Sequence, residues 1–364
     1  MSRKFTVFIT VITLSMLLIK PGEMLAEAGN ALLLWFNVVL PALFPFMAGM
    51  EILMRYGAAN LLGRIFEPLM RPVFNVPGCA ALAFIGGALS GYPLGAKITG
   101  ELLQKEKLTP EEGQRVMSFC NNPGPFFLLG AVAAGMLGSP GAGYLLIAAI
   151  FAAAVTTGIL FRSCGGGKAG RARTEYHTEY PENGVFPMLR EVISSCADAL
   201  VRVGGFMVMF SVIAGGAELL ARDFIPEAWN LGAVSGVLRG LLEMTGGAGT
   251  IAGADMSFGL KLGIIAAMTA FGGLSVHGQS LSMPGMEKLR GGVYVVSKAV
   301  NGLFAFLYTF LLWSLLPEGA VVAAARAGSA GSAASLKSAA AFLGLTLLYV
   351  LCVQRSRPRR QYKP

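Results

Sequence analysis

Charged residues are scarce in this chain. Asp, Glu, Lys and Arg make up only 13% of its 364 residues, whereas soluble globular domains carry about 25%. Hydrophobic residues supply 54%, and the mean hydropathy is +0.63. Several apolar runs approach the ~20 residues that span a bilayer. The composition excludes an ordinary water-exposed fold and predicts a multi-pass protein of the cell membrane, with the lipid bilayer as its first partner.

Histidine and paired cysteine are nearly absent. The chain has two histidines, and its five cysteines are scattered without a C-x-x-C pair, which argues against a metal cluster or a disulfide framework. Neither a G-x-S-x-G nor an H-E-x-x-H motif occurs. We therefore predict no enzyme activity, no catalytic residue, no metal site and no cofactor.

The net charge of +9 does not indicate a nucleic-acid partner. The excess lies at Arg3 and Lys4, in the 162–173 loop and in the C-terminal tail. Such clusters beside apolar runs orient a chain in the membrane or contact anionic lipid. No nucleic-acid recognition motif accompanies them, so we expect no nucleic-acid binding.

Long apolar runs predict an all-α polytopic fold with about eight transmembrane or re-entrant helices. A spanning backbone must satisfy its own hydrogen bonds, and these runs are long rather than alternating, so helices are expected and a barrel is not. The run at 5–19 is either a cleaved signal peptide or, as we favour, an uncleaved span. The 56–75 stretch mixes apolar residues with Arg and Glu, which suits a helix in the interface. The other predicted spans are 31–54, 79–96, 116–137, 144–161, 199–220, 258–276, 293–316 and 338–353.

The sequence also shows an internal duplication. Three stretches of the first half have partners in the second half, in the same order, and the central pair shares Gly-Gly followed by Leu-Ser. Each match is weak alone, because Gly- and Ala-rich membrane sequence imitates itself. Together they predict two related repeats, each with a long span, a glycine-broken helix and a second long span. The matched stretches are 44–62 with 204–220, 83–93 with 269–279, and 115–130 with 293–308.

Polar and helix-breaking residues interrupt the apolar pattern in both repeats, as "SGYP" (90–93) and "SVHGQ" (275–279). Freed backbone groups at membrane depth must be buried in protein or line a wet cavity, and paired breaks in two halves point to a transporter-like site. "CNNPGPFF" (120–127) is a further break facing the first. The predicted pathway residues are Ser90, Tyr92, Asn121, Asn122, Ser275, His277 and Gln279.

The glycine ladder of "GGALSGYPLGAK" (86–97) has two readings. Small residues let neighbouring helices approach closely, and glycine or proline also breaks a helix. We interpret the ladder as a packing face and the Ser-Gly-Tyr-Pro group as the break. The residues predicted to pack or break helices are Gly87, Gly91, Pro93, Gly95, Pro123, Gly124, Gly272 and Gly273.

Charged and capping residues give three local predictions. Thr109, Pro110 and Glu112 form the pattern of a capping box, which starts a helix. Lys97 follows the glycine ladder and is expected to extend to the membrane surface. Asp255, Lys261 and Lys298 lie close to apolar runs and are further candidates for the pathway.

The residues "FPFMAGMEILM", "EPLMRPVFNVPG", "GGALSGYPLGAK" and "SFCNNPGPFFLLGAV", all between 44 and 132, resemble the YlbJ family of sporulation integral membrane proteins, which carries a nucleoside recognition (Gate) domain. The resemblance implies a protein required for spore cortex formation in the mother-cell membranes of an endospore-forming bacterium. It implies no substrate, and it maps no established site onto this chain.

These observations predict an organisation and a function. The protein is expected to be a transporter or gate for a small solute, nucleoside-like, ionic or lipid-linked; the alternative is a non-transporting scaffold that organises sporulation membrane proteins for cortex assembly. Alternation of spans relates the two repeats by inversion, but it places the basic tail outside, which the positive-inside rule disfavours, so the orientation of the C-terminus stays open. The predicted units are an N-terminal anchor or signal-like span (1–30), a first Gate-like repeat (31–161), a basic solvent-exposed linker (162–194), a second Gate-like repeat (195–316), and a flexible segment with a last span and basic tail (317–364).

Overall fold

A computed structural model describes residues 3–166, 184–222 and 231–315. Within these ranges the chain is helical and contains no β-strand. The prediction of an all-α polytopic membrane protein is confirmed, although the predicted span at 338–353 lies outside the described residues. In the described part, five helical segments are long and apolar enough to cross a membrane, judged by length and composition: Pro21–Arg55, Pro140–Ser163, Val185–Leu220, Phe258–Leu281 and Gly291–Leu315.

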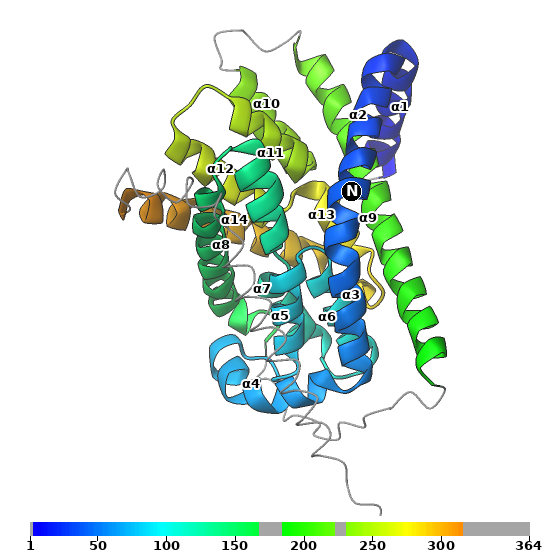
Figure 1. Cartoon of the computed structure of the whole chain (residues 1–364), viewed down its shortest axis with the longest axis vertical. Coiled ribbons are helices and arrows are strands. Elements are labelled where there is room, and N and C mark those ends of the chain that lie inside the picture. Colours follow the sequence, from blue (N-terminus) through cyan, green and yellow to red (C-terminus); the bar gives the residue numbers. More distant parts are fainter. Residues whose placement is uncertain (1–2, 167–183, 223–230, 316–364) are drawn as a thin grey trace, which may run out of the picture.

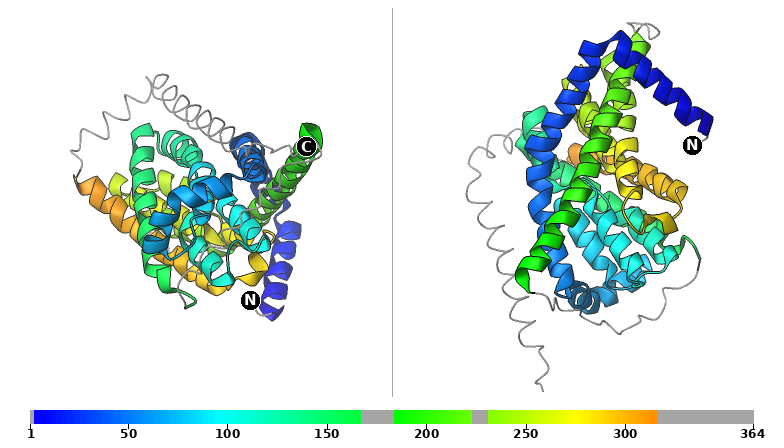
Figure 2. Two further views of the ribbon diagram at one scale, coloured as in Figure 1. Left: turned by 90° about the horizontal axis from the view of Figure 1, so that it is seen from below. Right: turned by 90° about the vertical axis from the view of Figure 1, so that its right-hand side faces the viewer.

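Two very long helical segments lie side by side along the molecule. α2 (Pro21–Leu34) continues through a π-helical turn, η1 (Trp35–Val39), into α3 (Leu40–Arg55). α9 (Val185–Arg222) runs beside this segment over most of its length, as the right-hand view of Figure 2 shows. At 1.5 Å per residue, a helix as long as α9 exceeds the ~30 Å hydrocarbon core of a bilayer, so it is tilted or extends beyond the membrane.

Shorter helices complete the first half of the chain. The amphipathic α4 lies at one end of the molecule, and α5, α6 and α7 stack above it beside α3 (Figure 1). Their bounds are α4 (Ala58–Phe74), α5 (Ala80–Ser90), α6 (Leu94–Gln104), α7 (Pro110–Cys120), the π-helix η2 (Phe127–Met136), α8 (Pro140–Leu160) and the 3-10 turn η3 (Phe161–Ser163).

The second half places α12 and α14 against each other and against α8. α10 and α11 lie at the end of the molecule opposite α4, and α1 packs near the start of α2 (Figure 1). The bounds are α1 (Arg3–Ile19), α10 (Leu231–Leu242), α11 (Met244–Gly253), α12 (Phe258–Phe271), α13 (Gly273–Leu281), the 3-10 turn η4 (Met286–Lys288) and α14 (Gly291–Leu315).

Two apolar clusters hold the helices together. One cluster joins the five helices from α3 through α7 to the first part of α9. Its buried side chains include Met47 and Phe119. The other joins η2, α8, α12 and α14 through side chains such as Ile150 and Ile265. A lipid-facing helix gains little from apolar burial, so close packing supplies much of the association energy. The many buried alanines allow that close packing.

One local prediction, the capping box, is confirmed by the structure, and a second, the interfacial helix at 56–75, is confirmed only as a helix. Thr109 caps α7: its hydroxyl accepts from the Glu112 N–H at 3.2 Å, and the Glu112 carboxylate accepts from the Thr109 N–H at 2.9 Å. The 56–75 stretch forms α4, which exposes Ile65 and Leu69 and does not qualify as a span.

Candidate functional site

The first helix break lies between α5 and α6. α5 ends at Ser90, and the chain passes through Gly91, Tyr92 and Pro93 before α6 begins. Gly91 has φ +97°, a conformation that costs glycine least, and a side chain there would overlap the backbone of Gly124. Two unwound stretches, 91–93 and 121–124, therefore meet backbone to backbone.

The second-half break lies between α12 and α13, and it differs from the prediction in position. The sequence placed it at "SVHGQ", but α12 ends at Phe271 and Gly272 adopts φ +91°. Residues 275–279 are helical and belong to α13. Gly272 and Gly273 both take positive φ at no steric cost, and side chains of Tyr92 and Asn301 bond to the carbonyl groups freed there, whereas "SVHGQ" continues as helix.

Side chains cap the carbonyl groups that the α12 break frees. The Tyr92 hydroxyl donates to the carbonyl oxygens of Thr269 and Ala270, at 3.1 and 3.0 Å. The Asn301 amide donates to the Ala270 oxygen at 3.2 Å, and His277 Nε2 lies 2.8 Å from the Phe271 oxygen. Because a buried unpaired carbonyl is costly, these contacts explain how the break is tolerated at membrane depth.

One candidate site is a cavity of about 720 Å³ beside the first break. Its wall combines Ser90, Tyr92 and the 123–127 stretch with parts of η1, α3, α9, η2, α11 and α13. Most of the wall is apolar. The cavity therefore lies where elements of both halves of the chain meet, and it is partly lined by unwound backbone.

Six polar side chains line this cavity: Asn37, Ser90, Tyr92, Glu243, Thr245 and Gln279. Ser90 Oγ is buried and has no hydrogen-bond partner within the described residues. Gln279 lines the wall from α13 and donates to Ser275 Oγ at 3.1 Å. Glu243 is held by the N–H groups of Thr245 and Gly246, at 2.9 and 2.7 Å, at the start of α11. The wall therefore combines hydroxyl, amide and carboxyl groups within a mostly apolar lining.

The predicted pathway residues divide into two groups. Ser90, Tyr92 and Gln279 line the cavity. Asn121, Asn122, Ser275 and His277 are buried behind it and bond to protein groups. Asn121 Nδ2 donates to Ser280 Oγ at 2.7 Å and to the Tyr294 hydroxyl at 2.8 Å, Asn122 Nδ2 donates to the Phe119 oxygen at 2.7 Å, and Asn122 Oδ1 accepts from Lys298 and Asn301.

The predicted glycines and prolines lie at close approaches of backbone. Side chains at Gly87 or Gly95 would overlap the carbonyl oxygen of Cys120, and one at Gly124 would overlap that of Ser90. Pro93 precedes α6, Pro123 lines the cavity, and Gly272 and Gly273 form the second break.

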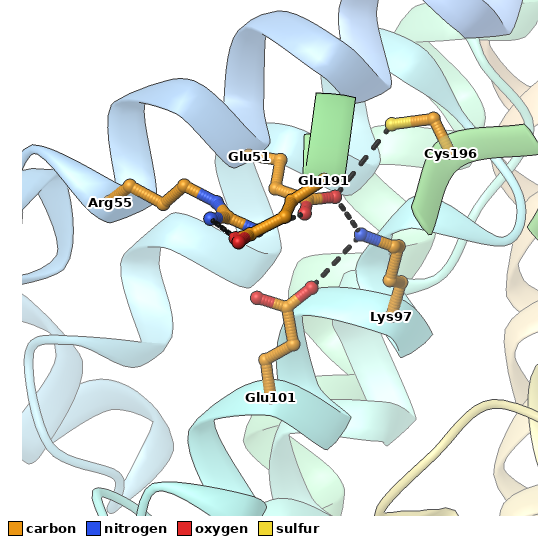
Figure 3. Close-up of polar contacts among 6 residues, drawn as sticks. All are labelled: Glu51, Arg55, Lys97, Glu101, Glu191 and Cys196. Carbon is orange, nitrogen blue, oxygen red and sulfur yellow. Dashed lines mark hydrogen bonds and ion pairs between the residues drawn. The ribbon is translucent and has the colours of Figure 1, made fainter. Parts of the chain in front are cut away.

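A cluster of charged side chains lies outside this cavity, on α3, α6 and α9 (Figure 3). The prediction that Lys97 extends to the surface is wrong: its side chain is buried, pairs with Glu51, and lies 3.0 Å from Glu101. Glu51 also pairs with Arg55 at 3.2 Å, and Arg55 reaches Glu191 of α9 at 2.6 Å. Lys97 points inward because Glu51 of α3 supplies a buried carboxylate for it there.

A second cavity, of about 700 Å³, adjoins the charged cluster. It is lined by Lys97 and Arg55, by polar residues of α9 such as Asp198 and Arg202, and by Pro284. Its wall is more polar than that of the first cavity. Sequence reasoning did not single it out, because its charged residues come from three separate elements, α3, α6 and α9.

Two other residues were missed or undervalued. Glu243 is a single acid in an apolar stretch, and the signal that could have found it is its place directly before "MTGG", where an acid caps a helix. Lys298, fully buried on α14, bonds to the first-half break. The apolar run around it gave a signal, but only the fold reveals its partners.

The apolar spans and broken helices define an integral membrane protein, and a cavity of small-molecule size lies between its helices. The chain belongs to the nucleoside recognition (Gate) family, whose model matches residues 36–221. It is 27% identical over 338 residues to the sporulation integral membrane protein YlbJ of Bacillus subtilis (strain 168), a match that covers 86% of this chain and 82% of the relative. No solved structure matches the chain.

Proposed function

We propose that the protein moves a small solute across the membrane as a transporter or gate. The observation that carries this proposal is the cavity at the first helix break, lined by the unpartnered Ser90 hydroxyl and by Gln279 from the second half. Broken helices whose ends face a cavity near the middle of a bundle are the usual form of a transporter binding site.

The size and lining of the cavity support a small organic solute. Ligand sites of this kind enclose about 300–1,000 Å³ and combine an apolar wall with a few polar groups. The cavity of about 720 Å³ falls in this range and offers Ser90, Gln279 and Glu243. A nucleoside-like molecule, with apolar ring faces and several donor groups, suits this lining better than a bare ion.

The two cavities support a pathway rather than an isolated pocket. On α9, Val203 and Met207 line the first cavity, while Ala199 and Arg202, one turn earlier, line the second. Gln279 lines the first, and Met283 lines the second, again about one turn apart. A solute leaving the apolar cavity along α9 would enter the polar one, past the ion pairs of Lys97.

The domain organisation is proposed to be two related repeats. The long helices α3 and α9, the broken pairs α5–α6 and α12–α13, and the following segments α7–η2 and α14 occur in the same order. The matched sequences fall on these elements. We further propose that the two repeats have inverted orientations in the membrane.

The biological role is proposed from the named relative. The relative is a sporulation integral membrane protein, so we infer that this chain acts in endospore formation, in mother-cell membranes, and is required for spore cortex formation. A deletion strain complemented by the gene, scored for cortex in electron micrographs, tests that role.

The transport proposal is tested by reconstituting the purified protein in liposomes and screening uptake of labelled nucleosides, cations and cell-wall precursors. Ser90→Ala is expected to lower uptake of the transported solute at least tenfold without changing protein abundance, because it removes the hydroxyl that has no hydrogen-bond partner in the described residues. The matched control is Ser118→Ala: this serine is also buried, but its hydroxyl bonds to the Arg115 oxygen of its own helix at 2.6 Å. Equal uptake by both variants contradicts the role of Ser90.

The alternative, a non-transporting scaffold for cortex-assembly proteins, makes opposite predictions. It requires no flux of any solute, tolerance at Ser90, and a specific membrane-protein partner in a pull-down. Absence of flux together with such a partner would replace the transport proposal.

A further inference from the structure

Lys298 is a buried lysine that no carboxylate contacts in the described parts of the chain. Its side chain is fully buried in the middle of α14. An isolated ammonium in a protein interior is costly. Something in its surroundings must therefore stabilise the charge.

The stabilising groups are oxygen atoms at the first-half break. Lys298 Nζ lies 2.6 Å from the carbonyl oxygen of Asn121 and 3.0 Å from Asn122 Oδ1. Asn121 directly follows α7, whose C-terminal end carries a partial negative charge. The ring of Tyr92 lies below the ammonium, with its centroid 5.5 Å from Nζ. The site is built from a helix C-terminus, an amide oxygen and an aromatic face.

Further hydrogen-bond acceptors lie near Lys298. Asn301 donates to Asn122 Oδ1 at 2.9 Å and to the Ala270 oxygen at 3.2 Å. Both of its partners are acceptors, so the orientation of its amide is fixed, and its own Oδ1 is buried without a partner among the described residues. Carbonyl and amide oxygens left at the ends of broken helices are the groups that coordinate sodium in membrane transporters.

We propose that the Lys298 ammonium occupies an interior site for a monovalent cation, so that the protein carries its own cation where the helix breaks meet. Tyr92 separates this site from the solute cavity, because its ring contacts Lys298 and also lines the cavity wall. Removing the ammonium without filling its space leaves a set of oxygens that a small cation can bind. A further consequence, which rests on the proposed function, is that solute uptake does not depend on sodium.

The test measures the thermal unfolding midpoint of the purified full-length protein in sodium, potassium and choline chloride at equal ionic strength. The parent is expected to unfold at the same temperature in all three salts. Lys298→Ala is expected to unfold at a lower temperature in choline, and sodium or potassium is expected to raise its midpoint saturably by about 2–4 °C or more, because a ligand that binds only the folded state stabilises it.

Two further variants isolate the cause. Lys298→Met removes the charge but fills the space, so its lower midpoint should not respond to the cation. Lys261→Ala is the matched control, since this lysine also donates to a backbone oxygen, that of Ala252 at 2.9 Å, but on α12 away from the breaks. It should show no difference between salts.

Two results overturn the proposal: a folded Lys298→Ala with no cation-specific rise, or a saturable sodium-specific rise in the parent. Where Lys298→Ala does not survive purification, Lys298→Ser, which keeps a hydroxyl ligand, replaces it, and the parent measurement needs no variant. Because unfolding is measured without transport, a failure to find any transported solute leaves this test readable. Where uptake is found, replacing sodium by choline should leave it unchanged.

Discussion

At the scale of single residues, glycine sets how closely the broken segments approach. Gly87 and Gly95, on opposite sides of the first break, both face the carbonyl oxygen of Cys120. No side chain fits at either position unless a backbone moves. The ladder is therefore a packing face at Gly87 and Gly95, whereas at Gly91 the positive φ makes it a break.

The residue-scale prediction concerns Gly87→Ala. The added methyl group would overlap the Cys120 oxygen, and overpacking of this kind costs about 1–3 kcal/mol, so the thermal unfolding midpoint should fall by several degrees. Gly49→Ala is the control, because nothing lies within 4 Å of a methyl group at this helical glycine of α3. Equal midpoints for the two variants would show that α5 and α7 adjust freely.

At the scale of elements, ion pairs join α3, α6 and α9 on one side of the breaks. Lys97 of α6 is held by Glu51 of α3, and Arg55 extends the contact to Glu191 of α9. Charged pairs cost free energy to bury, and apolar residues would pack these helices as well. Their position beside the second cavity fits elements that separate and reassociate.

The element-scale prediction is a double-variant comparison. Lys97→Met should lower the free energy of unfolding by about 3–5 kcal/mol, because it leaves the Glu51 carboxylate buried with one cation fewer. Adding Glu51→Gln should recover part of that loss. Lys105→Met, an exposed lysine directly after the same helix, should change stability by no more than about 0.5 kcal/mol. Additive losses in the double variant would mean that the two side chains are energetically independent.

At the scale of the whole molecule, the cavity exists because elements from both halves leave a space at the breaks. η2 contributes Gly130, where a side chain would meet nothing within 4 Å. Such a position allows the cavity to be filled without straining the backbone. A substitution at Gly130 can therefore test whether solute passes through the cavity without changing the stability of the fold.

The whole-molecule prediction is that Gly130→Phe blocks uptake while the unfolding midpoint stays near that of the parent. The aromatic ring would occupy the solute space. Gly205→Phe is the matched control: it adds the same ring at an exposed position of α9 that is also open, but away from the cavity. Both variants are compared in the liposome uptake assay. Undiminished uptake by Gly130→Phe would place the solute path elsewhere.

The sequence by itself determined the membrane class, the helices and the presence of breaks. Low charge, long apolar runs and the Thr109 capping box are local properties, and the rules that connect them to structure are local as well. The broken segment at Gly91–Pro93 could also be predicted locally, because glycine and proline determine the conformation of their own backbone. The resemblance to the Gate family rested on the same glycine and proline residues and on their spacing.

Only the tertiary structure decided where the second break falls and which side chains face the cavity. Gly272 and "SVHGQ" are both compatible with a break, and the carbonyl caps from Tyr92 and Asn301 stabilise it at Gly272. The burial of Lys97 and Lys298 was likewise not predictable from the local sequence. Each follows a pattern that predicts an end at the surface or in a pathway, yet both are buried, because their partners come from helices distant in the sequence. Burial and charge pairing depend on what packs against a residue, and no local pattern records that.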